Sequence, residues 1–269
     1  MDRKFLILIV LFGGYFILSS FRQDPVRGEL PFQAKEKLTY KIFYNWNFVW
    51  LSAGEVVFEV KDEGDVYHIE VSGKTYSSYE WFYKVRDKYH SYINKKTLLP
   101  TMYFREIQQG SYRHYEKIVF DHENNKATCY TGKTMSDATT TVLYNIENYY
   151  DMVSLMYLIR QTELSDFRKN KKLMLNLILD GQKYELSMKY LNDQKSLSVK
   201  ESGKYRTINC SADVVSGKVF DENASMKLFI GDDLNRFPVM IESPLTVGTV
   251  KAILKSVEWN KYNQDSKLK

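Results

Sequence analysis

Histidine and cysteine, the side chains most used for metal binding and nucleophilic catalysis, are scarce in this sequence, which has 4 His and 2 Cys among 269 residues. It contains no Cys-x-x-Cys pair, His-Glu-x-x-His motif, glycine-rich phosphate loop or Ser-His-Asp order. His114 and His122 have no third potential ligand nearby in the sequence, and His68 belongs to the polar side of an alternating segment, where solvation explains it. The sequence therefore predicts a protein that is not an enzyme and has no metal site and no cofactor.

Cys129 and Cys210 leave two interpretations open. An exported protein can keep a disulfide, but the sequence does not show whether these two residues come within bonding distance. A Cys129–Cys210 disulfide and two separate thiols are both compatible with it. Neither cysteine has the neighbours of an activated thiol.

Asp87 is a carboxylate that is expected to point into an apolar interior. It alternates in phase with Val85 and Tyr89, so the three side chains share one face of a strand. A buried carboxylate needs a partner, and Arg236, in a polar turn before Pro238, is the candidate. We expect Asp87 and Arg236 to form a structural ion pair that fixes the register of the sheet.

Large aromatic side chains gather near two loops that would connect neighbouring strands. The candidate ligand-binding residues among them are Trp46, Phe48, Trp50, Trp81 and Tyr83. Such a cluster can line the mouth of a site for an apolar or glycan ligand, or it can plug the core beneath long loops. Both interpretations remain open from the sequence.

The N-terminus resembles a secretory signal. Arg3 and Lys4 precede an apolar run over residues 5 to 18, and Ser19 and Ser20 follow it. Residues 1–20 are therefore expected to be a signal peptide or, alternatively, an uncleaved anchor in the inner membrane. The predicted location is the periplasm or the cell envelope.

Charge is balanced along the chain, with 38 basic and 33 acidic residues. The formal net charge of +5 is too small and too dispersed to indicate a nucleic-acid partner.

Alternation of apolar and polar residues predicts a mainly β protein. Tyrosine contributes 21 residues, and about seven strands are expected before residue 131. The dipeptide Asp180-Gly181 predicts a two-residue hairpin. Residues 148–168 instead predict the single amphipathic helix, with Met152, Leu155 and Ile159 on one face and Asp151 or Asn148 at its start.

About twelve to fourteen strands with one helix predict a large curved antiparallel sheet or incomplete β-barrel. Two packed sheets are the alternative. The polar faces are too frequent for the lipid-facing strands of an outer-membrane barrel. Residues 34–258 are expected to form one domain, and residues 259–269 a polar tail that frays.

Several short motifs resemble a family of exported bacterial envelope proteins, the domain of unknown function 3108 family. The matching segments are EKLTYK (36–41), AGE (53–55), YKVRDKY (83–89), LLP (98–100), VFD (119–121), DDLNRFPV (232–239) and GTV (248–250). The resemblance covers about residues 34 to 258 and implies a fold like the half-open barrels of lipoprotein carriers. Lys35 stands where the family usually has glycine, so the early turn is expected to differ.

These features together favour an exported, non-catalytic binding protein. Its ligand would be an amphiphile, such as a lipid or lipid-linked glycan, inside the sheet. The alternative is an envelope-assembly module that acts through protein–protein contacts at a sheet edge.

Overall fold

The computed structural model describes residues 29–46, 49–81, 83–215, 224–245 and 248–269. Across these residues the chain forms a single sheet of sixteen strands, two α-helices and two short 3₁₀ helices. The leader predicted at residues 1–20 lies outside the described residues. The elements are β1 (Lys37–Trp46), β2 (Val49–Glu63), β3 (Val66–Thr75), η1 (Ser77–Tyr79), β4 (Arg86–Asn94), β5 (Pro100–Gln109), β6 (Tyr112–Asp121), β7 (Lys126–Gly132), η2 (Met135–Asp137), β8 (Thr139–Tyr144), β9 (Tyr149–Tyr150), α1 (Met152–Gln161), α2 (Leu164–Asn170), β10 (Lys172–Leu179), β11 (Gln182–Val199), β12 (Gly203–Asp213), β13 (Ser225–Gly231), β14 (Pro238–Pro244), β15 (Thr249–Glu258) and β16 (Lys267–Leu268).

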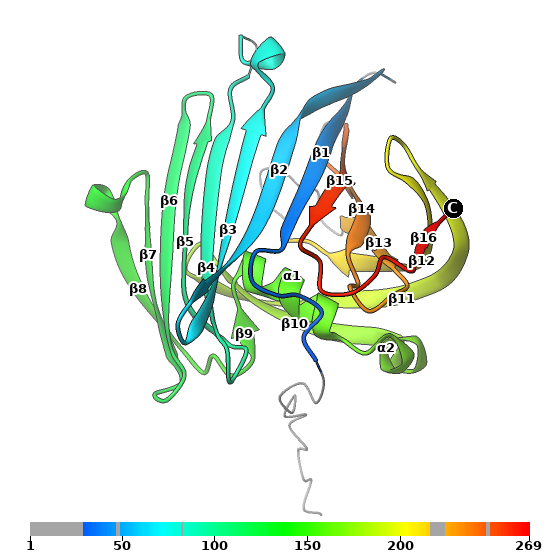
Figure 1. Ribbon diagram of the computed structural model, residues 1–269. Helices are drawn as coiled ribbons and strands as arrows, with labels where there is room; N and C mark the ends of the chain where they lie inside the picture. The colour runs from blue at the N-terminus through cyan, green and yellow to red at the C-terminus, as the bar shows by residue number, and fades with distance from the viewer. Residues whose placement is uncertain (1–28, 47–48, 82, 216–223, 246–247) are drawn as a thin grey trace, which may run out of the picture.

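The predicted curved sheet is confirmed. Its strand order is β8-β7-β6-β5-β4-β3-β2-β1-β15-β14-β13-β12-β11-β10-β9, with β16 added against β12. All the pairings are antiparallel except that of β9 with β10. Because β1 pairs with β15, the two strand-rich halves of the sequence join into one continuous surface, which wraps around α1 (Figure 1).

Local turn chemistry determines several of the hairpins. Asp180 and Gly181 connect β10 to β11 with φ angles of 51° and 67°, the left-handed values that a two-residue hairpin requires.

Lys35, where the family usually has glycine, has a φ angle of 71°, and its N–H donates to the carbonyl of Val60 at 2.7 Å. Lysine thus takes here a conformation that glycine adopts at lower cost.

The predicted helix consists of two shorter ones. Asp151 caps α1, because its carboxylate accepts hydrogen bonds from the backbone N–H groups of Val153 and Ser154 at 2.8 and 2.9 Å. The chain leaves the helical conformation at Thr162 and Glu163 before α2 begins. The helical region predicted near residues 148–168 is therefore confirmed, but it is divided into two helices where one was expected.

Helix α1 lies where three hydrophobic clusters meet. Val153 and Tyr157 belong to a cluster formed with β2 to β7, and Leu155 belongs to one formed with β10 to β13. Met156 packs against a third cluster, to which β1, β11, β12, β14 and β15 contribute. The helix is therefore buried on more sides than a single amphipathic stripe requires, and Met152, expected on the apolar face, is exposed.

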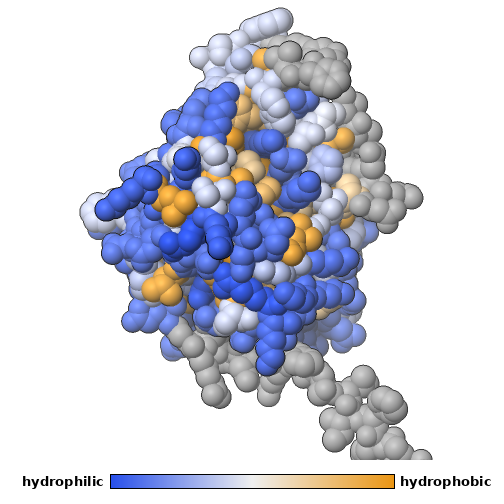
Figure 2. Space-filling view, turned by 90° about the vertical axis from the view of Figure 1, so that its right-hand side faces the viewer, coloured by the Kyte–Doolittle hydropathy of each residue, from blue (hydrophilic) through white to orange (hydrophobic). Residues whose placement is uncertain are grey.

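The C-terminal tail does not fray as expected. Within it, β16 pairs with β12, and Ser266 is buried, with its hydroxyl donating to Asp233 at 2.5 Å. Figure 2 shows the adjoining face as largely hydrophilic, with apolar side chains in small groups. Within the described residues, neither α1 nor α2 has the length and apolar character that a bilayer-crossing helix needs.

Candidate functional site

An apolar cavity of about 760 Å³ opens on the inner face of the sheet, at the end where η1 lies. The strands β1 to β5 form most of its wall, and the connection after η1 and the segment between β14 and β15 complete it. Most of the lining atoms are apolar. The lining residues are Ile42, Tyr44, Leu51, Ala53, Gly54, Glu55, Val56, Gly73, Lys74, Thr75, Tyr79, Trp81, Tyr83, Val85, Asp87, Tyr89, Gln109, Leu245 and Val250.

Two glycines in the cavity wall have different roles. Gly54 on β2 and Gly73 on β3 lie in adjacent strands, where Gly54 pairs with Thr75 and Gly73 pairs with Val56. A Cβ atom at Gly54 would lie 2.3 Å from the carbonyl oxygen of Lys74, so the close approach of the two strands requires glycine there. A Cβ at Gly73 would meet only ordinary contacts of 3.7 Å, so glycine at this position leaves open space.

Asp87 supplies a buried carboxylate to the cavity lining. Its carboxylate accepts hydrogen bonds from the backbone N–H of Gln108 at 3.0 Å and from the side-chain amide of Gln109 at 2.7 Å. Burial raises the pKa of Asp87, although these two hydrogen bonds and the charge of Arg105 oppose the rise. A carboxylate offers about four acceptor positions. Asp87 therefore retains acceptor capacity beside the cavity.

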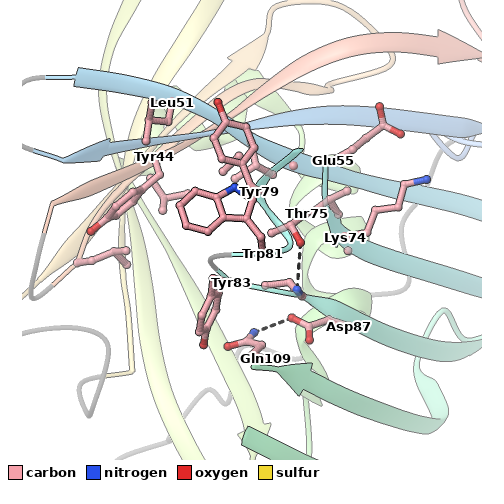
Figure 3. Close-up of a pocket in the computed structure, with 18 of the residues that line it drawn as sticks. Tyr44, Leu51, Glu55, Lys74, Thr75, Tyr79, Trp81, Tyr83, Asp87 and Gln109 are labelled. Carbon is pink, nitrogen blue, oxygen red and sulfur yellow. Dashed lines mark hydrogen bonds between the residues drawn. The ribbon is translucent and has the colours of Figure 1, made fainter. Parts of the chain in front are cut away.

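Aromatic side chains crowd the opening. Trp81 and Tyr83 are 83% and 46% exposed, and both follow η1. Figure 3 shows Tyr44, Tyr79 and Trp81 grouped at one side of the cavity, and Asp87 with Gln109 at the other. The opening thus combines apolar rings with hydroxyl and indole groups, which suits a ligand that is itself partly polar.

The aromatic residues predicted from the sequence divide into three groups. Trp81 and Tyr83 line the cavity. Trp50 is not among the lining residues, and the ammonium of Lys251 lies 4.4 Å from the centre of its ring. Phe48 lies outside the described residues, and only the backbone of Trp46 is described, as the end of β1.

The predicted ion pair between Asp87 and Arg236 is wrong. Arg236 lies at the C-terminal end of α1, where its guanidinium donates to Glu163 at 2.9 Å and to the carbonyl oxygen of Arg160 at 3.2 Å. The sequence located both charged residues correctly on structured segments, but it could not show that a neighbouring amide, Gln109, satisfies Asp87.

A fully buried arginine that the sequence analysis missed connects the motifs instead. The guanidinium of Arg160 forms a bidentate pair with Glu36 at 2.6 and 2.9 Å and also donates to the carbonyl oxygens of Pro31 and Asn235. The rings of Phe32, Tyr157 and Phe237 surround it. We call these seven residues the Arg160 cluster. The sequence pattern that could have identified Arg160 as buried is its spacing, three residues after Tyr157 and seven after Val153, which places all three on one face of the helix.

A second charged cluster lies on the inner face where the β10–β11 hairpin meets β5 and β6. Arg105 contacts Glu116 at 3.0 Å and Asp180 at 2.6 Å, and Asp180 also contacts His114 at 2.8 Å. His114 therefore has two carboxylates nearby: Glu116, two positions further along β6, and Asp180, which the distant β10–β11 hairpin supplies. Because the Arg105 guanidinium contacts both carboxylates, this cluster anchors the hairpin to β5 and β6.

The two cysteines are separate thiols. Cys129 belongs to the cluster of β2 to β7, and Cys210 belongs to the cluster of β10 to β13. Burial raises the pKa of each to about 12. Of the two interpretations left open by the sequence, the structure selects the one without a disulfide.

The fold and the cavity define a class of protein, a half-open antiparallel barrel with an apolar pocket in its wall. The family model described as "Protein of unknown function (DUF3108)" matches residues 39–255, so the chain belongs to this family, as the motifs indicated. No curated protein matches the sequence.

A solved structure is similar in fold. It is a beta-barrel-like protein of domain of unknown function DUF1849 from Brucella abortus, 8% identical in sequence. The match covers 84% of this chain and 98% of that one, with a TM-score of 0.55. At this identity the likeness establishes the barrel-like architecture alone.

Proposed function

We propose that this chain is an exported periplasmic or envelope protein that binds an amphiphilic ligand, such as a lipid or lipid-linked glycan, in the cavity beside Asp87. The observation that carries the proposal is the size and lining of the cavity. A volume of about 760 Å³ falls within the usual range of about 300–1,000 Å³ for small-molecule sites. The apolar run that follows Arg3 and Lys4 supports export, with or without cleavage of the leader.

The division of polar and apolar groups in the cavity supports an amphiphile. The apolar portion of the ligand would lie against Ile42, Val56 and the aromatic rings, where removal from water contributes about 25 cal/mol per Å². A hydroxyl or amine on the ligand would meet the carboxylate of Asp87.

Analysis of co-purifying molecules tests the proposal. The purified chain is extracted with organic solvent and the extract is analysed by mass spectrometry, and the delipidated protein is titrated with a fluorescent fatty acid. We expect stoichiometric binding in the wild type. A protein that carries no amphiphile and does not bind the probe would contradict the proposal.

Matched variants locate the binding site. Gly73→Leu places a side chain in the cavity without a backbone clash and should weaken probe binding at least about tenfold, since a filled cavity cannot admit the ligand. Trp81→Ala should weaken it less. Trp50→Ala is the control, because this exposed tryptophan is not among the lining residues. Unchanged binding in Gly73→Leu would place the ligand elsewhere.

A second candidate function, assembly through a sheet edge, is favoured by β8. This strand pairs only with β7 in the sheet order, and its sequence Thr-Thr-Thr-Val-Leu-Tyr contains no charge or proline to block further strand pairing. A photo-crosslinker at exposed Val142 should then capture one defined partner in cells, and Thr140→Lys should remove that product. Val119, an exposed valine on the internal strand β6, provides the control position. Equal crosslinking from both positions would argue against assembly through this edge.

A further inference from the structure

Two histidines and a glutamate gather on the outer face of the sheet, opposite the cavity wall. His68 and Glu70 lie on β3, and His90 lies on β4 directly across from Glu70. The inner face of β3 carries Ile69 and Val71, which belong to the hydrophobic core. Because side chains alternate along a strand, His68 and Glu70 point away from that core.

Nitrogen and oxygen atoms of this cluster converge on a small volume. His68 Nε2 lies 2.9 Å from His90 Nδ1, and one donor atom from each of His68, Glu70 and His90 lies within 4.8 Å of the others. The sequence predicted a solvated His68, yet this residue is only 6% exposed. The alternation was interpreted correctly, but neighbouring rings cover the imidazole.

Aromatic stacking holds both imidazoles in place. The ring of His68 stacks on Tyr92 at 4.3 Å with an interplanar angle of 9°. The ring of His90 stacks on Phe104 at 4.3 Å with an angle of 14°. Ligands that are fixed before binding lose less conformational entropy when they bind.

A carboxylate orients His68 from its other side. His68 Nδ1 lies 2.6 Å from a carboxylate oxygen of Glu63. When Nδ1 donates its hydrogen to Glu63, the lone pair of Nε2 points toward His90. A carboxylate behind a histidine in this manner is the usual outer partner of a metal-binding imidazole.

The charges around the cluster favour a cation. The negative charges of Glu59, Glu63 and Glu70 all attract the ammonium of Lys61, which contacts Glu70 at 2.6 Å. Lys88 is a further positive charge close to His90.

We propose that His68, His90 and Glu70 bind one divalent transition-metal ion of the zinc class, with Glu63 as the residue that positions His68. Two imidazoles and one carboxylate form a donor set that suits Zn²⁺ better than Mg²⁺ or Ca²⁺. Tetrahedral bonds of about 2.0–2.1 Å place two nitrogens about 3.3 Å apart, so the present 2.9 Å must widen slightly. The ion would join β3 to β4, two strands whose inner faces line the cavity.

Metal titration of the full chain tests this proposal. Protein treated with a chelator and then dialysed is titrated with ZnCl₂ against a chromophoric zinc indicator, and with CoCl₂ while its visible absorption is recorded. We expect one equivalent to bind, with a Co²⁺ spectrum typical of four ligands. Absence of binding at millimolar Zn²⁺ would overturn the proposal.

Variants identify the ligands. His68→Gln and His90→Gln should each weaken Zn²⁺ binding at least about tenfold, and Glu63→Gln by about tenfold, the usual effect of losing an outer partner. His122→Gln is the control, because His122 lies outside the cluster and contacts the carbonyl oxygen of Pro100. Unchanged binding in His90→Gln, or equal loss in His122→Gln, would refute the assignment.

A surface variant keeps the test decisive when a histidine variant does not fold. Lys61→Met removes the ammonium that competes for Glu70 from a half-exposed position. We expect it to bind Zn²⁺ more tightly than the wild type does. Equal or weaker binding would contradict the proposed role of Glu70.

Discussion

The Arg160 cluster and the cavity beside Asp87 both place a charged side chain among apolar groups. They differ in how many hydrogen-bond partners the charged group has. Arg160 is completely buried, and its guanidinium donates to Glu36 and to two backbone carbonyls. Asp87 has two donors and borders an open volume. A buried guanidinium with partners on several sides, such as that of Arg160, suits a structural role. A carboxylate that can still accept hydrogen bonds next to a cavity, such as that of Asp87, suits ligand binding.

The motifs that reveal the family belong in part to the structural region. Glu36 comes from the first motif, and Asn235 and Phe237 come from the late DDLNRFPV motif. Arg160, far from both in sequence, brings them together. The family resemblance is therefore carried partly by residues that hold the fold, while glycines and aromatic rings shape the cavity.

The largest effect on the stability of the fold is expected from Arg160→Met. It leaves the carboxylate of Glu36 buried without a partner, which should lower the free energy of unfolding by about 3–5 kcal/mol. Guanidinium unfolding measures this change. Lys41→Met is the control, because its partner Glu201 is half exposed and such a pair contributes less than about 1 kcal/mol.

Two outcomes would refine or contradict that prediction. The double variant Arg160→Met with Glu36→Met should recover part of the loss, because no unpaired charge remains. If Arg160→Met is no more destabilising than Lys41→Met, the distinction between the two regions fails.

The next largest effect separates the two glycines of the cavity wall. Gly54→Ala forces a Cβ atom against the carbonyl oxygen of Lys74 and should cost about 1–3 kcal/mol in the free energy of unfolding. Gly73→Ala meets ordinary contacts and should leave stability nearly unchanged. Urea unfolding of both variants makes the comparison, and equal losses would show that Gly54 is not under steric constraint.

A smaller, pH-dependent effect is expected for Asp87→Asn. The folded-state pKa of Asp87 lies above its ordinary value of 3.8, so the folded protein binds more protons than the unfolded chain between these two values. The stability contributed by the protonated carboxyl is present at low pH and is lost as pH rises through the folded-state pKa. The asparagine variant lacks this loss.

The difference in unfolding midpoint between Asp87→Asn and the wild type should therefore shift in favour of asparagine as pH rises above 3.8, and then become constant. Urea unfolding measured from pH 4 upward checks this dependence. A difference that does not vary with pH would show that Asp87 is solvated despite its position.

The smallest effect concerns the cysteines. Cys129 and Cys210 lie in different clusters with thiol pKa values raised to about 12, so a reductant should not change the thermal unfolding temperature. Dithionitrobenzoate should react slowly with the native protein and with two thiols after denaturation. Rapid reaction of either thiol in the native protein would reveal local opening of its cluster.

Local patterns were sufficient to predict much of the fold. Alternation located the strands, Asp180-Gly181 fixed a hairpin, and residues 148–168 marked the helical region. The break at Thr162 and the pairing of β16 were missed, because each depends on contacts with distant segments.

The candidate site was only partly predictable. Trp81 and Tyr83 were identified because aromatic crowding is visible in the sequence, and Trp50, chosen for the same reason, is not among the residues that line the cavity. The roles of Gly54 and Gly73 were missed, since an empty volume depends on which residues face each other across strands. The expected Asp87–Arg236 pair failed because the partner of a buried charge is chosen by three-dimensional proximity.

The sequence by itself determined the periodicity of this protein: where strands, turns and the helical region lie, and which faces are apolar. These properties depend on neighbours a few residues apart, where backbone geometry is regular. Only the tertiary structure decided that Arg160 meets Glu36, that Gly73 leaves open space in the cavity wall, and that His68 meets His90. Such contacts depend on how the sheet curves and which strands pair, which no local pattern contains.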